Sequence, residues 1–330
     1  MPSSTSSSRQ ELKVVLCVAA SLLVVELASR AFGSRISKEI RYIRTFPRKA
    51  DSLRKSKSRR ILILGNSLTN CGLDLPLLKS QLPRHSRDRF HIETIAMDGT
   101  AITEWYHIFR RFFAEPKQLP NVVIVNFHPA GKDAGIADEK LVRMERLVHY
   151  FRARDIPQVA LNEVEGFGNR CRFVQSYLLA SFGNRARFKR MALGALGTVP
   201  HYARGERHMH RLAASRRKGG RAKPPVPTYR MLGKLAGLTH RCDVQLILVA
   251  MPVSEYVPTG PALTRLVHAE GLSLLDCQRP PGLTAEGYAD SSHLNEQGEQ
   301  IFTRYYAERI AKELTRESSP SEALEPGAGR

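Results

Sequence analysis

The sequence is poor in cysteine and lacks the common patterns of metal and nucleic-acid binding. Its five cysteines are scattered, with no Cys-x-x-Cys pair, which argues against a zinc cluster. Their odd number, with Cys17 inside an apolar run, argues against a dense disulfide framework. RNA-binding aromatic motifs, zinc-finger spacings and heptad repeats are absent from the sequence. We therefore expect no metal, no other cofactor and no nucleic-acid partner.

Acidic residues are scarce relative to basic ones. The chain has 51 Lys and Arg against 31 Asp and Glu, a formal net charge of +20. Such a charge favours contact with an anionic lipid or polymer, although a basic surface without a dedicated ligand is the simpler interpretation. A length of 330 residues with 42% hydrophobic residues indicates one large globular domain with appendages.

A long uncharged run near the N-terminus suggests a membrane segment. Val14–Val25 carries no charge, and extension past Glu26 to Phe32 gives 19 residues, close to the length of a membrane span. We predict a signal peptide or membrane anchor over residues 1–33, followed by a basic connector over residues 34–58. Ser29 and Ala31 are small enough for a cleavage site, so cleavage and retention are both open. Export of the rest of the chain is favoured, although positive charge after such a segment prefers the cytoplasmic side.

Apolar strands alternate with helical patterns in the remainder of the chain. The predicted strands cover residues 60–65, 89–97, 121–127, 243–253 and 272–277, and the predicted helices 73–82, 102–113, 229–241 and 295–314. This alternation predicts a mostly parallel sheet with helices on both faces. Residues 150–230 are basic and show no clear strand, so we predict an insertion that is helical early and flexible near residues 216–227. Residues 317–330 are predicted to be a disordered tail.

Polar residues follow the predicted strands at positions where a parallel sheet binds its ligands. Ser67 follows the first strand, Gly99 the second, and Asn126 lies at the end of the third. Asp290 and His293 precede the last helix. A serine hydroxyl becomes a nucleophile when a base removes its proton, and a histidine held by a carboxylate is such a base.

These segments resemble the SGNH/GDSL hydrolase family. Gly65-Asn66-Ser67-Leu68 is similar to the family's G-[DN]-S-[LIY] block, and Asp290-Ser291-Ser292-His293 to its D-x-x-H block. The third block departs from the family pattern, because Val-Asn-Phe-His stands where G-x-N-D is usual. The resemblance covers residues 60–127 and 240–314 and implies a three-layer α/β/α, flavodoxin-like domain over residues 59–316. It also implies a catalytic triad of Ser67, Asp290 and His293, with an oxyanion hole formed by Ser67, Gly99 and Asn126.

Each of these residues also has a purely structural interpretation. Asn66 and Ser67 can cap a helix, Asp290 can cap another, and Gly99 can be an ordinary turn glycine. Their joint position and order favour catalysis. We assign no role to His128, and we interpret Trp105 as a residue of the core or of the cleft wall.

The resemblance implies an exported, membrane-associated serine esterase that forms an acyl-Ser67 intermediate. Its expected substrate is an O-acyl ester of a cell-envelope glycan or lipid, and its expected place is the periplasm or cell envelope, anchored or secreted. Its other expected partners are the membrane, through the N-terminal segment, and an anionic lipid or polymer at the basic insertion. One alternative is an O-acyltransferase with the same triad that modifies an envelope polysaccharide. Another is a non-catalytic envelope scaffold that binds an anionic partner.

Overall fold

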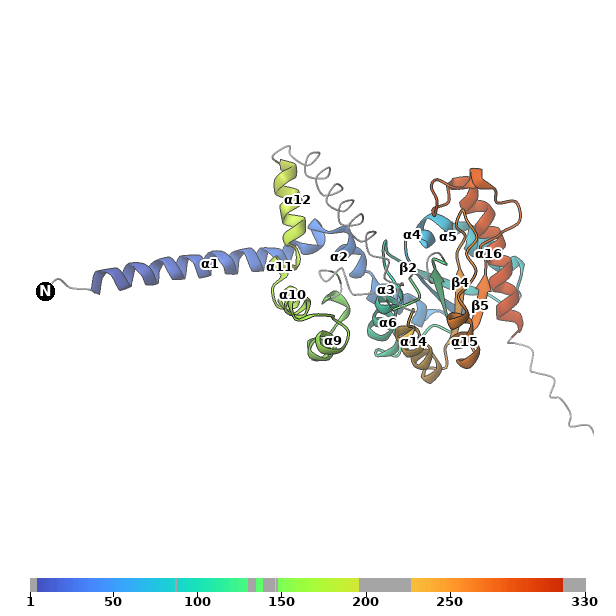
Figure 1. Cartoon of the computed structure of the whole chain (residues 1–330), viewed down its shortest axis with the longest axis horizontal. Helices are drawn as coiled ribbons and strands as arrows, with labels where there is room; N and C mark the ends of the chain where they lie inside the picture. The colour runs from blue at the N-terminus through green and yellow to red at the C-terminus, as the bar shows by residue number, and fades with distance from the viewer. Residues whose placement is uncertain are drawn as a thin grey trace, which may run out of the picture. The chain divides into compact units, whose positions relative to one another are not determined.

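The computed structural model describes residues 5–86, 88–129, 135–138, 146, 148–195 and 227–316. The chain divides into two compact units, drawn in Figure 1. One contains Met1–Thr45 and Lys140–Val226, and the other contains Phe46–Glu139 and Pro227–Arg330. The predicted disordered tail and most of the predicted flexible stretch lie outside the described residues.

A five-stranded parallel sheet forms the centre of the second unit. Its strands are β1 (Arg59–Gly65), β2 (Phe90–Ala96), β3 (Val122–Phe127), β4 (Gln245–Ala250) and β5 (Ser273–Asp276), in the spatial order β2-β1-β3-β4-β5. All neighbouring strands are parallel. This is the flavodoxin-like order of a doubly wound fold, in which the strand order reverses beside β1. The predicted fold class and all five predicted strands are confirmed.

Helices cover both faces of the sheet. On one face lie α5 (Leu75–Gln81) and α16 (Glu296–Arg316), and on the other α3 (Phe46–Lys55), α6 (Ile102–Phe109) and α14 (Arg230–Arg241), with α15 (Pro261–Ala269) beside α14 in Figure 1. Ile61 and Ile63 of β1 face the cluster under α16. Leu62 and Leu64 are equally buried on the opposite face, because side chains alternate along a strand. Burial on both faces explains why the strands are continuous apolar runs.

Local chemistry determines where the helices begin. The Asp74 carboxylate accepts the backbone N–H of Leu77 at 3.0 Å, and a proline follows in the first turn of α5. This is the start that the sequence predicts. Helix α3 falls within the segment predicted to be a basic connector, and it packs against β2 in the sheet unit. Neither α15 nor the short helix α4 (Ser67–Gly72) is among the helices that the sequence predicts.

The first unit is built around one long apolar helix. Helix α1 (Thr5–Ile36) contains the stretch Gln10–Arg35, which is long and apolar enough to cross a membrane. An 18-residue window of this stretch has a mean hydropathy of 2.2 and is 6% buried. Short helices gather at its C-terminal part in Figure 1: α2 (Lys38–Ile43), α10 (Phe167–Leu178), α11 (Ala180–Gly183) and α12 (Arg185–Ala195). The described part of the insertion is thus helical, as predicted.

Candidate active site

The predicted nucleophile lies where β1 becomes a short helix. The Asn66 side-chain oxygen accepts the backbone N–H of Leu68 at 3.1 Å and so caps α4. Ser67 is the first residue of that helix, directly beyond the carboxyl end of β1. The cap expected on structural grounds is therefore present, and it belongs to Asn66 and not to the serine.

Gly65 fixes the backbone beneath this serine. Its carbonyl accepts three hydrogen bonds, from Met97 N–H at 3.2 Å, the Thr100 hydroxyl at 2.8 Å and the Trp105 indole N–H at 3.2 Å. A Cβ at this position would overlap the Thr69 hydroxyl, so only glycine fits without movement. Trp105 is 1% exposed and is a core residue, one of the two alternatives that we predicted for it.

The loop before α16 presents the other two residues of the predicted triad. An antiparallel bridge closes the segment Tyr288–Leu294 around Asp290 and His293. The backbone N–H and the hydroxyl of Ser254, in the loop after β4, both donate to the carbonyl of Ser291, at 3.2 and 2.9 Å. The loop is therefore tied to the carboxyl edge of the sheet.

Three side chains meet at this edge. The Nε2 atom of His293 lies 3.0 Å from the Oγ of Ser67, and its Nδ1 atom lies 2.9 Å from Oδ2 of Asp290. The His293 side chain and the backbone N–H groups of Ser292 and His293, both at 2.8 Å, lower the pKa of Asp290 to about 2. An ionised carboxylate only accepts hydrogen bonds, so the His293 Nδ1 atom carries the proton. In the neutral ring, the Nε2 lone pair then faces the serine hydroxyl, as a general base requires.

The triad is open to solvent. The side chain of Asp290 is 57% exposed and that of His293 is 33% exposed. Cys71, on α4, is also exposed, and partial desolvation of its sulfur, together with the negative charges of Asp98 and Glu299, raises the pKa of its thiol. This neighbouring thiol is therefore held in its less nucleophilic form.

Two further residues lie at the site. His128 Nε2 is 3.5 Å from the Ser292 hydroxyl, and burial, with repulsion from a protonated His293 as the second cause, lowers the pKa of His128. Gly135 lies over the nucleophile turn, since a Cβ there would be 3.8 Å from the Asn66 side-chain nitrogen. Neither His128 nor Gly135 has a predicted role. His128 could have been found from its place directly after β3, whereas nothing in the sequence marks Gly135.

Gly99 occupies a tight turn after β2. Its φ of 63° is left-handed, a conformation that glycine adopts without strain, and the turn closes through the Thr100 N–H and the Met97 carbonyl at 3.2 Å. The Asp98 carboxylate in the same turn accepts the side-chain N–H of Asn70 on α4 at 3.1 Å. The turn that carries Gly99 is thus tied to the helix that begins with Ser67.

Asn126 is held inside the sheet unit. Its side chain is fully buried, and its Oδ1 atom accepts the hydroxyl of Tyr306 on α16 at 2.9 Å. Its Nδ2 group is enclosed and has no hydrogen-bond partner among the described residues. A substrate oxygen reaches this donor only after a neighbouring side chain moves. The structure brings Ser67, Asp290 and His293 into direct contact, whereas it ties Asn126 to the core.

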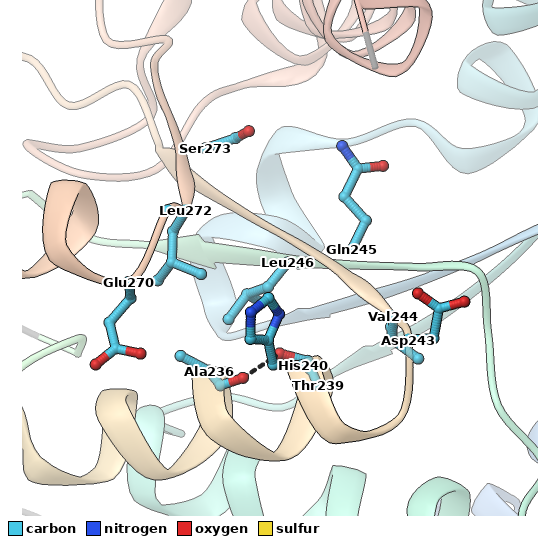
Figure 2. A pocket seen from close by; sticks show the side chains of 11 residues that line it. Ala236, Thr239, His240, Asp243, Val244, Gln245, Leu246, Glu270, Leu272 and Ser273 are labelled. Atoms are coloured by element: carbon cyan, nitrogen blue, oxygen red, sulfur yellow. Dashed lines mark hydrogen bonds between the residues drawn. The ribbon is translucent and has the colours of Figure 1, made fainter. Parts of the chain in front are cut away.

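A cavity of about 230 Å³ lies at the opposite, amino ends of β4 and β5. His240, Asp243 and Glu270 line it, and Figure 2 shows no hydrogen bond joining these three side chains. Across the described part of the chain, no group of three or more His, Cys, Asp or Glu residues is arranged to hold a metal ion.

Comparisons with known proteins return distant structures. Neither a protein-family model nor a curated protein matches the chain. Among solved structures, a lipase/acylhydrolase from Enterococcus faecalis has 12% identity and a TM-score of 0.38, covering 77% of this chain and 96% of its own. The esterase EstA from Pseudoalteromonas has 13% identity and a TM-score of 0.39, covering 78% and 99%. A GDSL-like lipase from Bacteroides thetaiotaomicron has 11% identity and a TM-score of 0.38, covering 82% and 98%.

At these low TM-scores the assignment rests on the chain's own fold and geometry. The parallel sheet has the flavodoxin-like order, and a Ser-His-Asp triad stands beyond its carboxyl edge. Together they assign Ser67, Asp290 and His293 to one triad, formed by the two sequence blocks that resemble the SGNH/GDSL family.

Proposed function

We propose that the protein is a membrane-anchored, extracytoplasmic serine esterase that cleaves O-acyl esters of a cell-envelope glycan or lipid. The observation that carries the proposal is the 3.0 Å contact between Ser67 Oγ and His293 Nε2, with Asp290 on the other ring nitrogen. The apolar stretch of α1 and the net charge of +20 support a place at a membrane that carries anionic groups.

The proposed reaction has two steps. The Ser67 oxygen attacks the ester carbonyl while His293 Nε2 takes the hydroxyl proton, and Asp290 stabilises the imidazolium. The backbone N–H groups of Ser67 and Gly99 and the Asn126 amide stabilise the tetrahedral oxyanion, each donor contributing on the order of 10²–10³ in rate. His293 then gives its proton to the departing alcohol, which leaves an acyl-Ser67 ester. Water, deprotonated by His293, attacks this ester, and His293 returns the proton to the Ser67 oxygen as the acid is released.

The exposure of the triad favours hydrolysis over transfer to a sugar hydroxyl. More than half of the Asp290 side chain and a third of the His293 side chain are exposed, so bulk water reaches the base directly. An acyltransferase has to keep water away from its acyl-enzyme, which an open triad does not do.

The test uses the full chain in detergent and a fluorophosphonate probe that reacts with activated serines. We expect stoichiometric labelling of Ser67, located by mass spectrometry, and hydrolysis of p-nitrophenyl acetate. Ser67→Ala should lose both, whereas Ser80→Ala, which removes an exposed hydroxyl on α5, should keep both. Equal labelling of the wild type and of a folded Ser67→Ala variant would sink the proposal. Acetyl transfer to an added glycan at a rate above hydrolysis would instead favour the acyltransferase.

A further inference from the structure

Between Val14 and Gly33, helix α1 carries two charged residues, Glu26 and Arg30, and the insertion binds both. The Glu26 carboxylate accepts the backbone N–H groups of Ala180 and Ser181 at 2.8 and 3.0 Å and the Ser181 hydroxyl at 2.8 Å. The Arg30 guanidinium donates to the same carboxylate at 2.7 Å and to the Leu178 carbonyl at 2.6 Å. Charged groups in a membrane segment require such partners. The corner between α10 and α11 is therefore docked on the anchor, and it gives α1 a structural role beyond targeting.

The length of the apolar stretch places this corner at the membrane surface. About 20 helical residues cross the hydrocarbon core, and a count from Val14, the first residue after Lys13, ends near Gly33. Glu26 and Arg30 lie near the C-terminal end of these 20 residues. The docked corner exposes Leu178 and Leu179, with 59% and 46% of their surfaces accessible. Two exposed leucines at this depth suit contact with acyl chains.

A cavity of about 440 Å³ opens beside the same end of α1. Gly33 lines it from α1, Ile40 from α2 and Leu178 from α10. Its basic lining residues are Arg30, Arg44 and His149, and none of its described lining residues is Asp or Glu. The cavity thus combines an apolar wall with basic groups at the level expected for lipid headgroups.

Among the described residues, Arg44 is the cationic group of this cavity that pairs with no carboxylate. Arg30 is paired with Glu26, whereas the guanidinium of Arg44 donates to the neutral hydroxyl of Ser34 at 2.8 Å and pairs with no carboxylate of the described residues. Burial, and after it the positive charges of Arg187 and Arg44, lowers the pKa of His149 to about 4. At neutral pH the imidazole is uncharged, and the cavity keeps a positive field that an anion would neutralise.

We propose that this cavity binds the phosphate headgroup of an anionic membrane lipid. Arg44 is the phosphate ligand, because a guanidinium donates several parallel hydrogen bonds to phosphate oxygens. Leu178 and Leu179 lie beside the acyl chains. The apolar wall and the exposed leucines favour a lipid over free phosphate, and the inference rests on the membrane anchoring in the proposed function.

The test is native mass spectrometry of the full chain released from detergent that contains phosphatidylglycerol or phosphatidylcholine. We expect one phosphatidylglycerol to stay bound per chain, and Arg44→Gln to weaken its binding about fivefold to tenfold. The matched control is Arg41→Gln, which removes the same charge from an exposed position on α2 that does not line the cavity. This control should bind like the wild type, and circular dichroism should report equal helix content in all three proteins.

Three results would overturn the inference. Equal losses of lipid binding in Arg44→Gln and Arg41→Gln would mean that the lipid is attracted by basic charge in general. Equal retention of phosphatidylcholine and phosphatidylglycerol would mean that the site does not distinguish headgroup charge. Displacement of the lipid by millimolar inorganic phosphate would mean a site for the free ion. Ser67→Ala should retain the lipid, and Arg44→Gln should retain esterase activity. The lipid-binding proposal and the esterase proposal can therefore be contradicted independently of each other.

Discussion

The two ends of the parallel sheet carry the same kinds of side chain and differ in how these are joined. Beyond the carboxyl end, an imidazole touches a serine hydroxyl at 3.0 Å and a carboxylate at 2.9 Å. At the amino end, His240, Asp243 and Glu270 line a cavity, and no hydrogen bond joins their side chains in Figure 2. Residue types alone therefore do not make a catalytic site; the contacts between the side chains do.

The difference follows from the local structure at each end of the sheet. His240 lies in the last turn of α14, where a basic residue suits the helix dipole, and Asp243 has a φ of 52°, a turn conformation that Asp tolerates. Both residues thus serve the connection from α14 to β4. At the carboxyl end, a bridged loop and a capped helix hold His293 and Ser67 in mutual reach.

The largest expected effect comes from removing one histidine at each end. His293→Ala should lower kcat for p-nitrophenyl acetate by about 10⁴-fold or more, because the serine loses its base. His240→Ala should leave kcat within about twofold, because nothing joins this ring to a nucleophile. Similar losses in both variants, measured on protein with unchanged circular dichroism, would remove the distinction between the two ends.

The next largest effects concern the two polar atoms of the Asn126 side chain, Nδ2 and Oδ1. Asn126→Ala should lower kcat about 10²–10³-fold if its enclosed amide turns to the oxyanion as proposed. Tyr306→Phe removes the hydroxyl that binds Asn126 Oδ1 and should lower the free energy of unfolding by about 1–3 kcal/mol, with kcat changed only a few-fold. Denaturant unfolding and steady-state kinetics on both variants measure this. An Asn126→Ala enzyme with full kcat would leave the asparagine a structural role only.

The sheet could be read from the sequence because both of its faces are buried. Such strands are continuous apolar runs, bounded here by polar turns, and Asp74 and Pro76 mark the start of α5. Helix α15 gives a weaker signal, since only Leu263 and Val267 are buried in it, and α4 has six residues, too few for a period. These helices are determined by packing and by caps.

The triad could be predicted because its residues lie at strand ends and in a short, recognisable loop. The environment of Asn126 could not, because its Tyr306 partner is 180 residues away along the chain. The positions of His128 and Gly135 depend in the same way on how separate loops meet. The sequence thus predicts the three side chains that meet at this edge of the sheet, but not the neighbours that surround them.

A smaller effect on stability is expected at Gly65, beneath the nucleophile. Gly65→Ala should lower the free energy of unfolding by about 1–3 kcal/mol, because the new methyl group overlaps the Thr69 side chain. Adding Thr69→Gly should restore part of the loss, since it removes the atoms in conflict and also a buried hydroxyl without a partner among the described residues. Thermal unfolding of the single and double variants measures the recovery. No recovery in the double variant would locate the strain in the backbone.

The smallest expected effect is a shift in the titration of Asp290. Its pKa is about 2, first because of the His293 side chain and then because of the backbone N–H groups of Ser292 and His293. These groups bind the charged form of Asp290. The carboxylate therefore stabilises the loop fully at a pH above its ordinary pKa of 3.8, and this stabilisation is lost as the pH falls through about 2. His293→Ala should raise this pKa without restoring 3.8, because both backbone N–H groups remain. Carbon-detected NMR of the Asp290 carboxyl measures it, and an unchanged pKa would show that the backbone alone holds the carboxylate ionised.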